Sequence, residues 1–106
     1  MVLGEVVPIT IDHRKGSIDE NGVYYPINVG YIDNPTCETG KQRVYLLGVL
    51  DPIDSYNGEF LGYVKSKGDE DRIVCGNFSE YFSDDQILSE IDFLDKYCSI
   101  ERPVSI

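Results

Sequence analysis

Apolar residues gather into short runs between the N-terminus and Phe78, and polar, glycine-containing segments separate these runs. Short runs rich in β-branched and aromatic residues are typical of strands. The pattern predicts five strands: Val2–Asp12, Val23–Ile32, Arg43–Leu50, Glu59–Lys67 and Arg72–Phe78. Their regular turn spacing predicts a small β-barrel or a strongly curved antiparallel sheet.

The pattern changes to a helical period after Phe82. Ser83, with Gln86 at the third helical position, has the sequence of a capping box. The apolar residues that follow recur at intervals of four, three and four: Ile87, Ile91, Leu94 and Cys98. This spacing puts them on one helical face. We therefore expect an amphipathic helix that runs to about Cys98 and closes one end or side of the barrel.

The chain has 106 residues, 42% of them apolar, and this predicts one domain spanning residues 1–106. Nine Lys and Arg against nineteen Asp and Glu give a net charge of −10. Because this charge repels phosphate backbones and anionic lipid heads, we expect no nucleic-acid or membrane binding, although a small anion could be held locally. The first residues lack the basic and apolar regions of a signal peptide, so we expect a cytoplasmic protein.

The metal-binding residue types other than carboxylates are sparse. The three cysteines lie far apart without a C-x-x-C motif, and His13 is the only histidine. This content argues against a zinc site within one chain. We expect the cysteines to be reduced, buried thiols.

Besides the tyrosine-rich segment YYPINVGYI, three polar clusters are candidates for chemistry. Asp12–Ser17 sets cations beside a Gly-Ser turn, whose N–H groups can hold an anion. Thr36–Arg43 carries Lys41 at the junction with the third predicted strand. Gly68–Arg72 contains three acids, whose oxygens suit Mg²⁺ or Ca²⁺. A solvated loop for the first cluster and a charged hairpin tip for the third are the alternative interpretations.

The order of these segments resembles the soluble family I inorganic pyrophosphatases, most closely their short members from Firmicutes. The resemblance extends from about Val6 to Glu101, and its closest motif is YYPINVGYI, where the family has a Y-P-x-N-Y-G-Y-I pattern. It implies a closed five-stranded, OB-like barrel with a helix packed outside, a homo-oligomer, and Mg²⁺-dependent hydrolysis of pyrophosphate to phosphate. In such chemistry carboxylates hold the metal ions while Lys, Arg and Tyr hold the phosphate oxygens.

Several positions depart from the pattern that the resemblance implies. In the segment ETGKQR, Glu38 replaces the first aspartate of the family's D-G-x-x-x-D motif. Arg43 stands where the last metal-binding aspartate is expected, and Val29 stands where an active-site tyrosine is expected. A guanidinium cannot coordinate a metal ion. These changes indicate that Mg²⁺-dependent hydrolysis is impaired or lost.

Other positions keep side chains suited to the implied roles. The substrate-binding candidates are the basic residues His13, Arg14, Lys41 and Arg43. The metal-binding candidates are the acids Glu38, Asp69, Glu70 and Asp71. In an active enzyme Glu38 and Arg72 would be the catalytic residues, because Arg72 matches a phosphate-binding lysine of the family and Glu38 would hold Mg²⁺.

Three functions follow from these residues. The first is a binding or regulatory module for a small anion such as pyrophosphate or phosphate, without Mg²⁺-dependent hydrolysis. The second is a divergent but active phosphohydrolase that uses Mg²⁺. The third is a structural, oligomer-forming protein. The charge reversal at Arg43 adds a hypothesis: Lys41 and Arg43 pair with Glu38 or the acids of Asp69–Asp71, so that an internal salt bridge replaces the metal ion.

Overall fold

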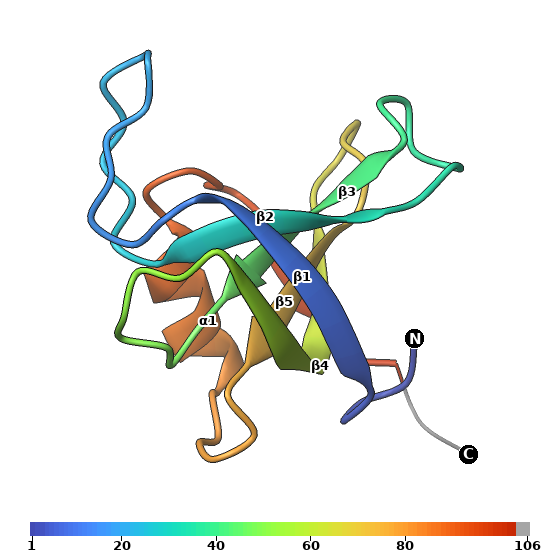
Figure 1. Cartoon of the computed structure of the whole chain (residues 1–106). Helices are drawn as coiled ribbons and strands as arrows, with labels where there is room; N and C mark the ends of the chain where they lie inside the picture. The colour runs from blue at the N-terminus through green and yellow to red at the C-terminus, as the bar shows by residue number, and fades with distance from the viewer. Residues whose placement is uncertain (104–106) are drawn as a thin grey trace.

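A computed structural model describes residues 1–103, so the last three residues of the predicted domain lie outside the described part (Figure 1). It contains six strands and one helix. In chain order they are β1 Val6–His13, β2 Asn28–Asp33, β3 Lys41–Leu46, β4 Ser55–Lys65, β5 Arg72–Gly76, α1 Asp84–Ile91 and β6 Ser99–Glu101.

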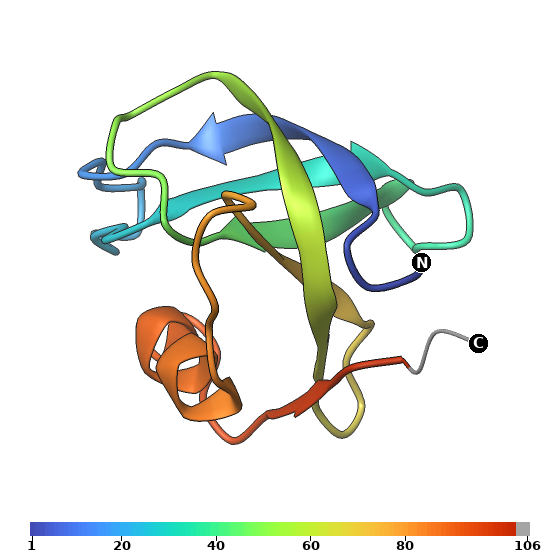
Figure 2. The same ribbon diagram turned by 90° about the horizontal axis from the view of Figure 1, so that it is seen from below.

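Five of the strands close into a barrel, as the sequence predicts. They pair in the order β1, β2, β3, β5, β4 and back to β1, and only β3 and β5 run parallel. β6 pairs with the far half of the long strand β4, outside the ring. α1 also lies outside the ring of strands (Figure 2). The mainly β, OB-like barrel with a C-terminal helix is therefore confirmed.

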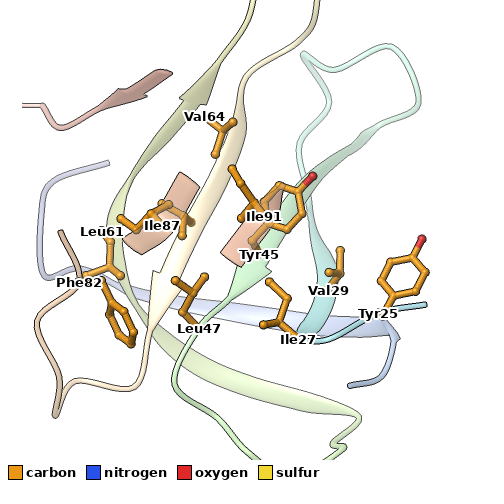
Figure 3. Packing of buried hydrophobic residues seen from close by; sticks show 11 residues of the cluster. Tyr25, Ile27, Val29, Tyr45, Leu47, Leu61, Val64, Phe82, Ile87 and Ile91 are labelled. Atoms are coloured by element: carbon orange, nitrogen blue, oxygen red, sulfur yellow. The ribbon is translucent and has the colours of Figure 1, made fainter. Parts of the chain in front are cut away.

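Two apolar cores hold this architecture together, one on each face of the strands. The barrel interior is filled by Val7, Ile9, Ile11, Val44, Leu46, Phe60, Ile73 and Cys75. The outer core lies between the barrel and α1 and includes Val29, Tyr45, Leu61, Val64, Val74, Ile87 and Ile91 (Figure 3). Because alternate residues of a strand point to opposite faces, β3 supplies both cores.

Local backbone chemistry moves several strand ends away from their predicted positions. Met1–Glu5 forms a turn, in which the Glu5 N–H donates to the Val2 carbonyl, so β1 begins only at Val6. β2 begins at Asn28, after Pro26, which has no N–H for a sheet. β3 ends at Leu46, just before Gly48 turns left-handed with φ +79°.

β4 and β6 correct the predicted pattern further. Ser55–Asn57 reads as a turn in the sequence, but it belongs to β4 and closes the barrel against β1. Gly58 in the same stretch is required by space, since a Cβ there would lie 2.9 Å from the Cβ of Cys75. β6, with three residues, has no sequence pattern long enough to predict it.

The capping box of α1 is confirmed, but the predicted helix length is wrong. The Ser83 side chain accepts from the Gln86 N–H, and the Gln86 side chain accepts from the Ser83 N–H. The helix ends at Ile91, not Cys98. Leu94 is 41% exposed, and Phe93 packs against the outer core instead. Across residues 1–103 no helix has the length and apolar character needed to cross a membrane.

The cysteine prediction holds only in part. All three cysteines are free, but Cys75 alone is buried, inside the barrel. Cys37 and Cys98 are half-buried.

Candidate functional site

Two adjoining hollows lie between the 34–40 loop and the 66–71 hairpin, which extend from the same end of the barrel (Figure 1). One has a volume of about 240 Å³ and the other of about 440 Å³. They share the residues Arg43, Glu70 and Arg72. We call the two together the outer cleft. The lining of the outer cleft also includes Asp12, Tyr31, Tyr45 and Asp95.

Strand alternation places the basic residues of β3 in this cleft. Gln42, Val44 and Leu46 are buried toward the barrel interior. The intervening positions therefore face outward, so Lys41 and Arg43 lie two residues apart on one face of β3. Both line the outer cleft.

Arg43 is paired, but with a partner that the sequence does not predict. Its Nη1 donates to Asp12 Oδ1 at 2.9 Å and to the Gly30 carbonyl at 3.2 Å. Asp12 lies at an irregularity where the register of β1 against β2 shifts between Ile11 and His13. The hypothesis is therefore wrong about the partner, since Arg43 forms a salt bridge with Asp12 and not with Glu38 or the acids of Asp69–Asp71.

Lys41 is the second cation on this face of β3. Its Nζ lies 4.2 Å from the centre of the Tyr31 ring, a cation–π contact. Lys41 makes no salt bridge with any carboxylate among residues 1–103. Arg43 is also partly open, with 35% of its side chain exposed.

Arg72, in contrast, is almost fully engaged. Its Nε and Nη2 donate to the two oxygens of Asp95 at 3.1 and 3.0 Å. Nη1 donates to the Glu70 carbonyl at 2.7 Å, and Nη2 also donates to Ser66 Oγ at 3.0 Å. The Tyr45 hydroxyl donates to the same Asp95 carboxylate. Burial, followed by this bond, raises the pKa of Tyr45.

The four predicted metal-binding acids do not form a metal site. Glu70 accepts from the backbone N–H of Glu38 at 2.9 Å. Asp71 pairs with Lys65 at 2.7 Å, and Asp69 accepts from Ser66 Oγ at 2.9 Å. Within residues 1–103 no three His, Cys, Asp or Glu side chains are grouped so that they could hold a metal ion. The donor set therefore does not fit the Mg²⁺ that the resemblance implies.

The two remaining substrate-binding candidates lie elsewhere. His13 stacks on Tyr25 with ring centres 4.4 Å apart. Arg14 forms a salt bridge with Asp54, in which its Nε donates at 2.8 Å. Neither residue lines the outer cleft. The structure thus brings together Glu38, Lys41, Arg43, Asp69, Glu70, Asp71 and Arg72, but leaves out His13 and Arg14.

Sequence reasoning missed two acids that anchor this site. Asp12 is 31 positions from Arg43, and no local pattern links the two. Asp95 had a signal: it lies four residues after Ile91, so it extends the apolar stripe of Ile87 and Ile91 with a carboxylate. A charge on an apolar stripe indicates a buried partner, which here is Arg72.

The comparisons with known proteins leave the resemblance untested. No protein-family model, no curated protein and no solved structure matches this chain. The outer cleft must therefore be interpreted from its own chemistry.

Proposed function

We propose that this protein is a pyrophosphatase-like binding module that holds a small phosphate-type anion in the outer cleft and does not hydrolyse it with Mg²⁺. The observation that carries the proposal is that two cations, Lys41 and Arg43, lie side by side on one face of β3. Lys41 has no carboxylate partner among the described residues, and Arg43 is partly exposed in the same hollow. Two adjacent cations with free donors suit the oxygens of a phosphate group.

The acids of the cleft support the absence of hydrolysis. Hydrolysis assisted by metal ions requires several carboxylates that converge on the ion. Here Asp12 is bound to Arg43, Asp71 to Lys65 and Asp95 to Arg72. Carboxylates held by the protein's own cations are poorly available as metal ligands, and among residues 1–103 the remaining acids form no group of three metal-ligating side chains.

Charge also limits the size of the ligand. Three cations line the cleft, Lys41, Arg43 and Arg72, against six acids, Asp12, Glu38, Asp69, Glu70, Asp71 and Asp95. This excess of acids disfavours long polyphosphates, which would spread beyond the two cations of β3. Phosphate or pyrophosphate is the better match.

The decisive experiment combines turnover with binding. Phosphate release from pyrophosphate is measured between about pH 7 and pH 9 with excess Mg²⁺, and separately with Mn²⁺, against an active short family member. We expect no release above a metal-free blank. Calorimetric titration with pyrophosphate without metal should show binding that Lys41→Ala weakens by about tenfold, the value of one charge-assisted hydrogen bond.

Lys67→Ala is the matched control, because it removes the same charge from an exposed position outside the cleft lining. Turnover near that of the active family member would overturn the loss of hydrolysis. Equal affinities of the Lys41→Ala and Lys67→Ala variants, or no binding by the unaltered protein, would overturn the binding role. The predicted homo-oligomer and cytoplasmic location stay predictions.

A further inference from the structure

The Asp95 carboxylate lies in the second hollow of the outer cleft, where donors from two barrel strands hold it. Its two oxygens accept a two-point contact from Arg72, at 3.1 and 3.0 Å, and its Oδ2 also accepts from the Tyr45 hydroxyl. Planar two-point recognition by a guanidinium is the preferred way to hold a carboxylate or phosphate in proteins. We call these donors, Arg72 and Tyr45, the Arg72 cradle.

Barrel strands carry the two donors of the Arg72 cradle, whereas Asp95, which accepts from them, lies outside the strands. Arg72 lies in β5 and is only 9% exposed, and Tyr45 lies in β3 and is 1% exposed. Arg72 is further held by the Glu70 carbonyl and Ser66 Oγ, so its position does not depend on Asp95 alone. Asp95 belongs to the irregular segment between α1 and β6. The donors are therefore fixed, while the acceptor is carried by a connection.

That segment, Asp92–Cys98, is partly exposed. Leu94 is 41% exposed and Tyr97 is 99% exposed. Tyr97 also has φ +56°, a left-handed conformation that costs a non-glycine residue free energy. Phe93 and Cys98 pack on the outer core, and the salt bridge of Asp95 supplies the polar contact with the barrel. Beside this apolar packing, the Asp95 carboxylate is therefore the charged contact that joins the segment to the barrel.

We propose that Asp95 is an internal occupant of an anion site, and that Asp92–Cys98 is a strap that closes this end of the cleft. An external carboxylate or phosphate that enters the Arg72 cradle must displace Asp95 and release the strap. The inference rests on the proposed function, since it concerns the same cleft, and it adds a regulatory contact. Because Asp95 is tethered, its effective concentration is high, so a free anion competes poorly until Asp95 is removed.

The test is anion rescue of a variant without the occupant. Asp95→Ala leaves Arg72 and Tyr45 without their acceptor, so its melting temperature in sodium chloride should fall below that of the unaltered protein. At equal ionic strength, sodium phosphate or sodium acetate should raise the Tm of Asp95→Ala by about 5 °C or more. Phosphate and acetate in separate arms distinguish a phosphate site from a general oxyanion site.

Asp92→Ala is the matched control, because it removes the same charge from the exposed side of the segment, where Asp92 pairs with Lys96. Its Tm should respond to the anions no more than that of the unaltered protein. Equal anion responses of Asp95→Ala and Asp92→Ala would overturn the proposal. If Asp95→Ala does not fold, Asp95→Asn keeps the side-chain shape with one acceptor oxygen, and it must show the same excess response over Asp92→Asn.

Hydrogen exchange tests the strap itself. The amides of residues 92–98 should exchange faster in Asp95→Asn than in Asp92→Asn, and unchanged exchange would overturn the strap.

Anion rescue and pyrophosphate binding together distinguish a failure of this proposal from a failure of the proposed function. Anion rescue of Asp95→Ala should persist when Lys41 is also changed to Ala, because the cradle does not use Lys41. A protein that fails to bind pyrophosphate but shows rescue would lose only the proposed function.

Discussion

At the scale of single residues, Gly30 lies where β1 leaves no room for a side chain on β2. A Cβ at this position would lie 2.0 Å from the carbonyl oxygen of Thr10, far inside contact distance. The Gly30 carbonyl also accepts from Arg43. Gly30→Ala should therefore force the strands apart and lower the free energy of unfolding by about 3 kcal/mol, measured by urea denaturation.

Gly40→Ala separates the close approach from ordinary backbone strain. Gly40 has φ +75°, but nothing lies within 4 Å of a Cβ placed there. The cost at Gly40 should be about 1 kcal/mol, from the left-handed backbone alone. If the two variants lose the same stability, the contact with Thr10 is not what fixes glycine at position 30.

Some residues of the cleft could be predicted because their charge is unusual for their position in the chain. Lys41 and Arg43 stand out because cations interrupt an acidic chain at the start of a strand. Arg43 was expected to meet acids that are nearer in the chain or in the motif, but it meets Asp12. The register shift of β1 decides this partner, and a register shift leaves no mark in the order of apolar and polar residues.

At the scale of elements, α1 is specified by its first turn more clearly than by its last. Ser83 and Gln86 form the reciprocal capping box, and Asp84 and Asp85 suit the positive end of the helix dipole. Ser83→Ala removes one acceptor for the free N–H groups of this turn. It should lower the free energy of unfolding by about 1 kcal/mol in urea denaturation.

Ser89→Ala is the internal comparison for this prediction. Ser89 is exposed inside α1, where alanine is the better helix former by about 0.5 kcal/mol. The two substitutions of the same type should therefore change stability in opposite directions. A loss of stability for Ser89→Ala as large as that for Ser83→Ala would show that the cap is not the cause.

The five barrel strands, apart from the start of β4, and the helix start were predictable, but the helix end was not, and the reason is tertiary. Ile87, Ile91 and Leu94 fit a longer helix by period alone. In the folded chain Asp95 turns toward Arg72 and Tyr45 while Phe93 packs against Tyr25 and Tyr45. These contacts compete with further helical hydrogen bonds, and beyond Ile91 the chain adopts the conformation that the contacts require.

At the scale of the whole molecule, barrel closure assembles the outer cleft from distant segments. Tyr45 and Asp95 are 50 positions apart, and Arg72 and Asp95 are 23 positions apart. The two loops were predicted as polar clusters, and their acids and cations do line one cleft. The pairing of each acid was not predictable, because it depends on which strands become neighbours across the barrel.

Closure also buries groups that should resist ionisation, and this predicts an alkaline limit to stability. Burial raises the pKa of the Cys75 thiol from 9.0 to about 12, and burial also raises the pKa of Tyr45. In the unfolded chain these groups lose protons at lower pH than in the folded chain. The unfolded state then binds fewer protons, so stability falls as pH rises above about 9.

Cys75 alone should reduce the free energy of unfolding by about 1.4 kcal/mol between pH 8 and pH 10, since each pH unit above the unfolded pKa contributes about that amount. Urea denaturation at a series of pH values measures the slope. Cys75→Ala should flatten the slope between about pH 9 and pH 10, whereas Cys37→Ala, at a half-buried position in the 34–40 loop, should flatten it less. Equal slopes in both variants would mean that the buried thiol does not set the alkaline limit, and the fall would then have to come from tyrosines such as Tyr45.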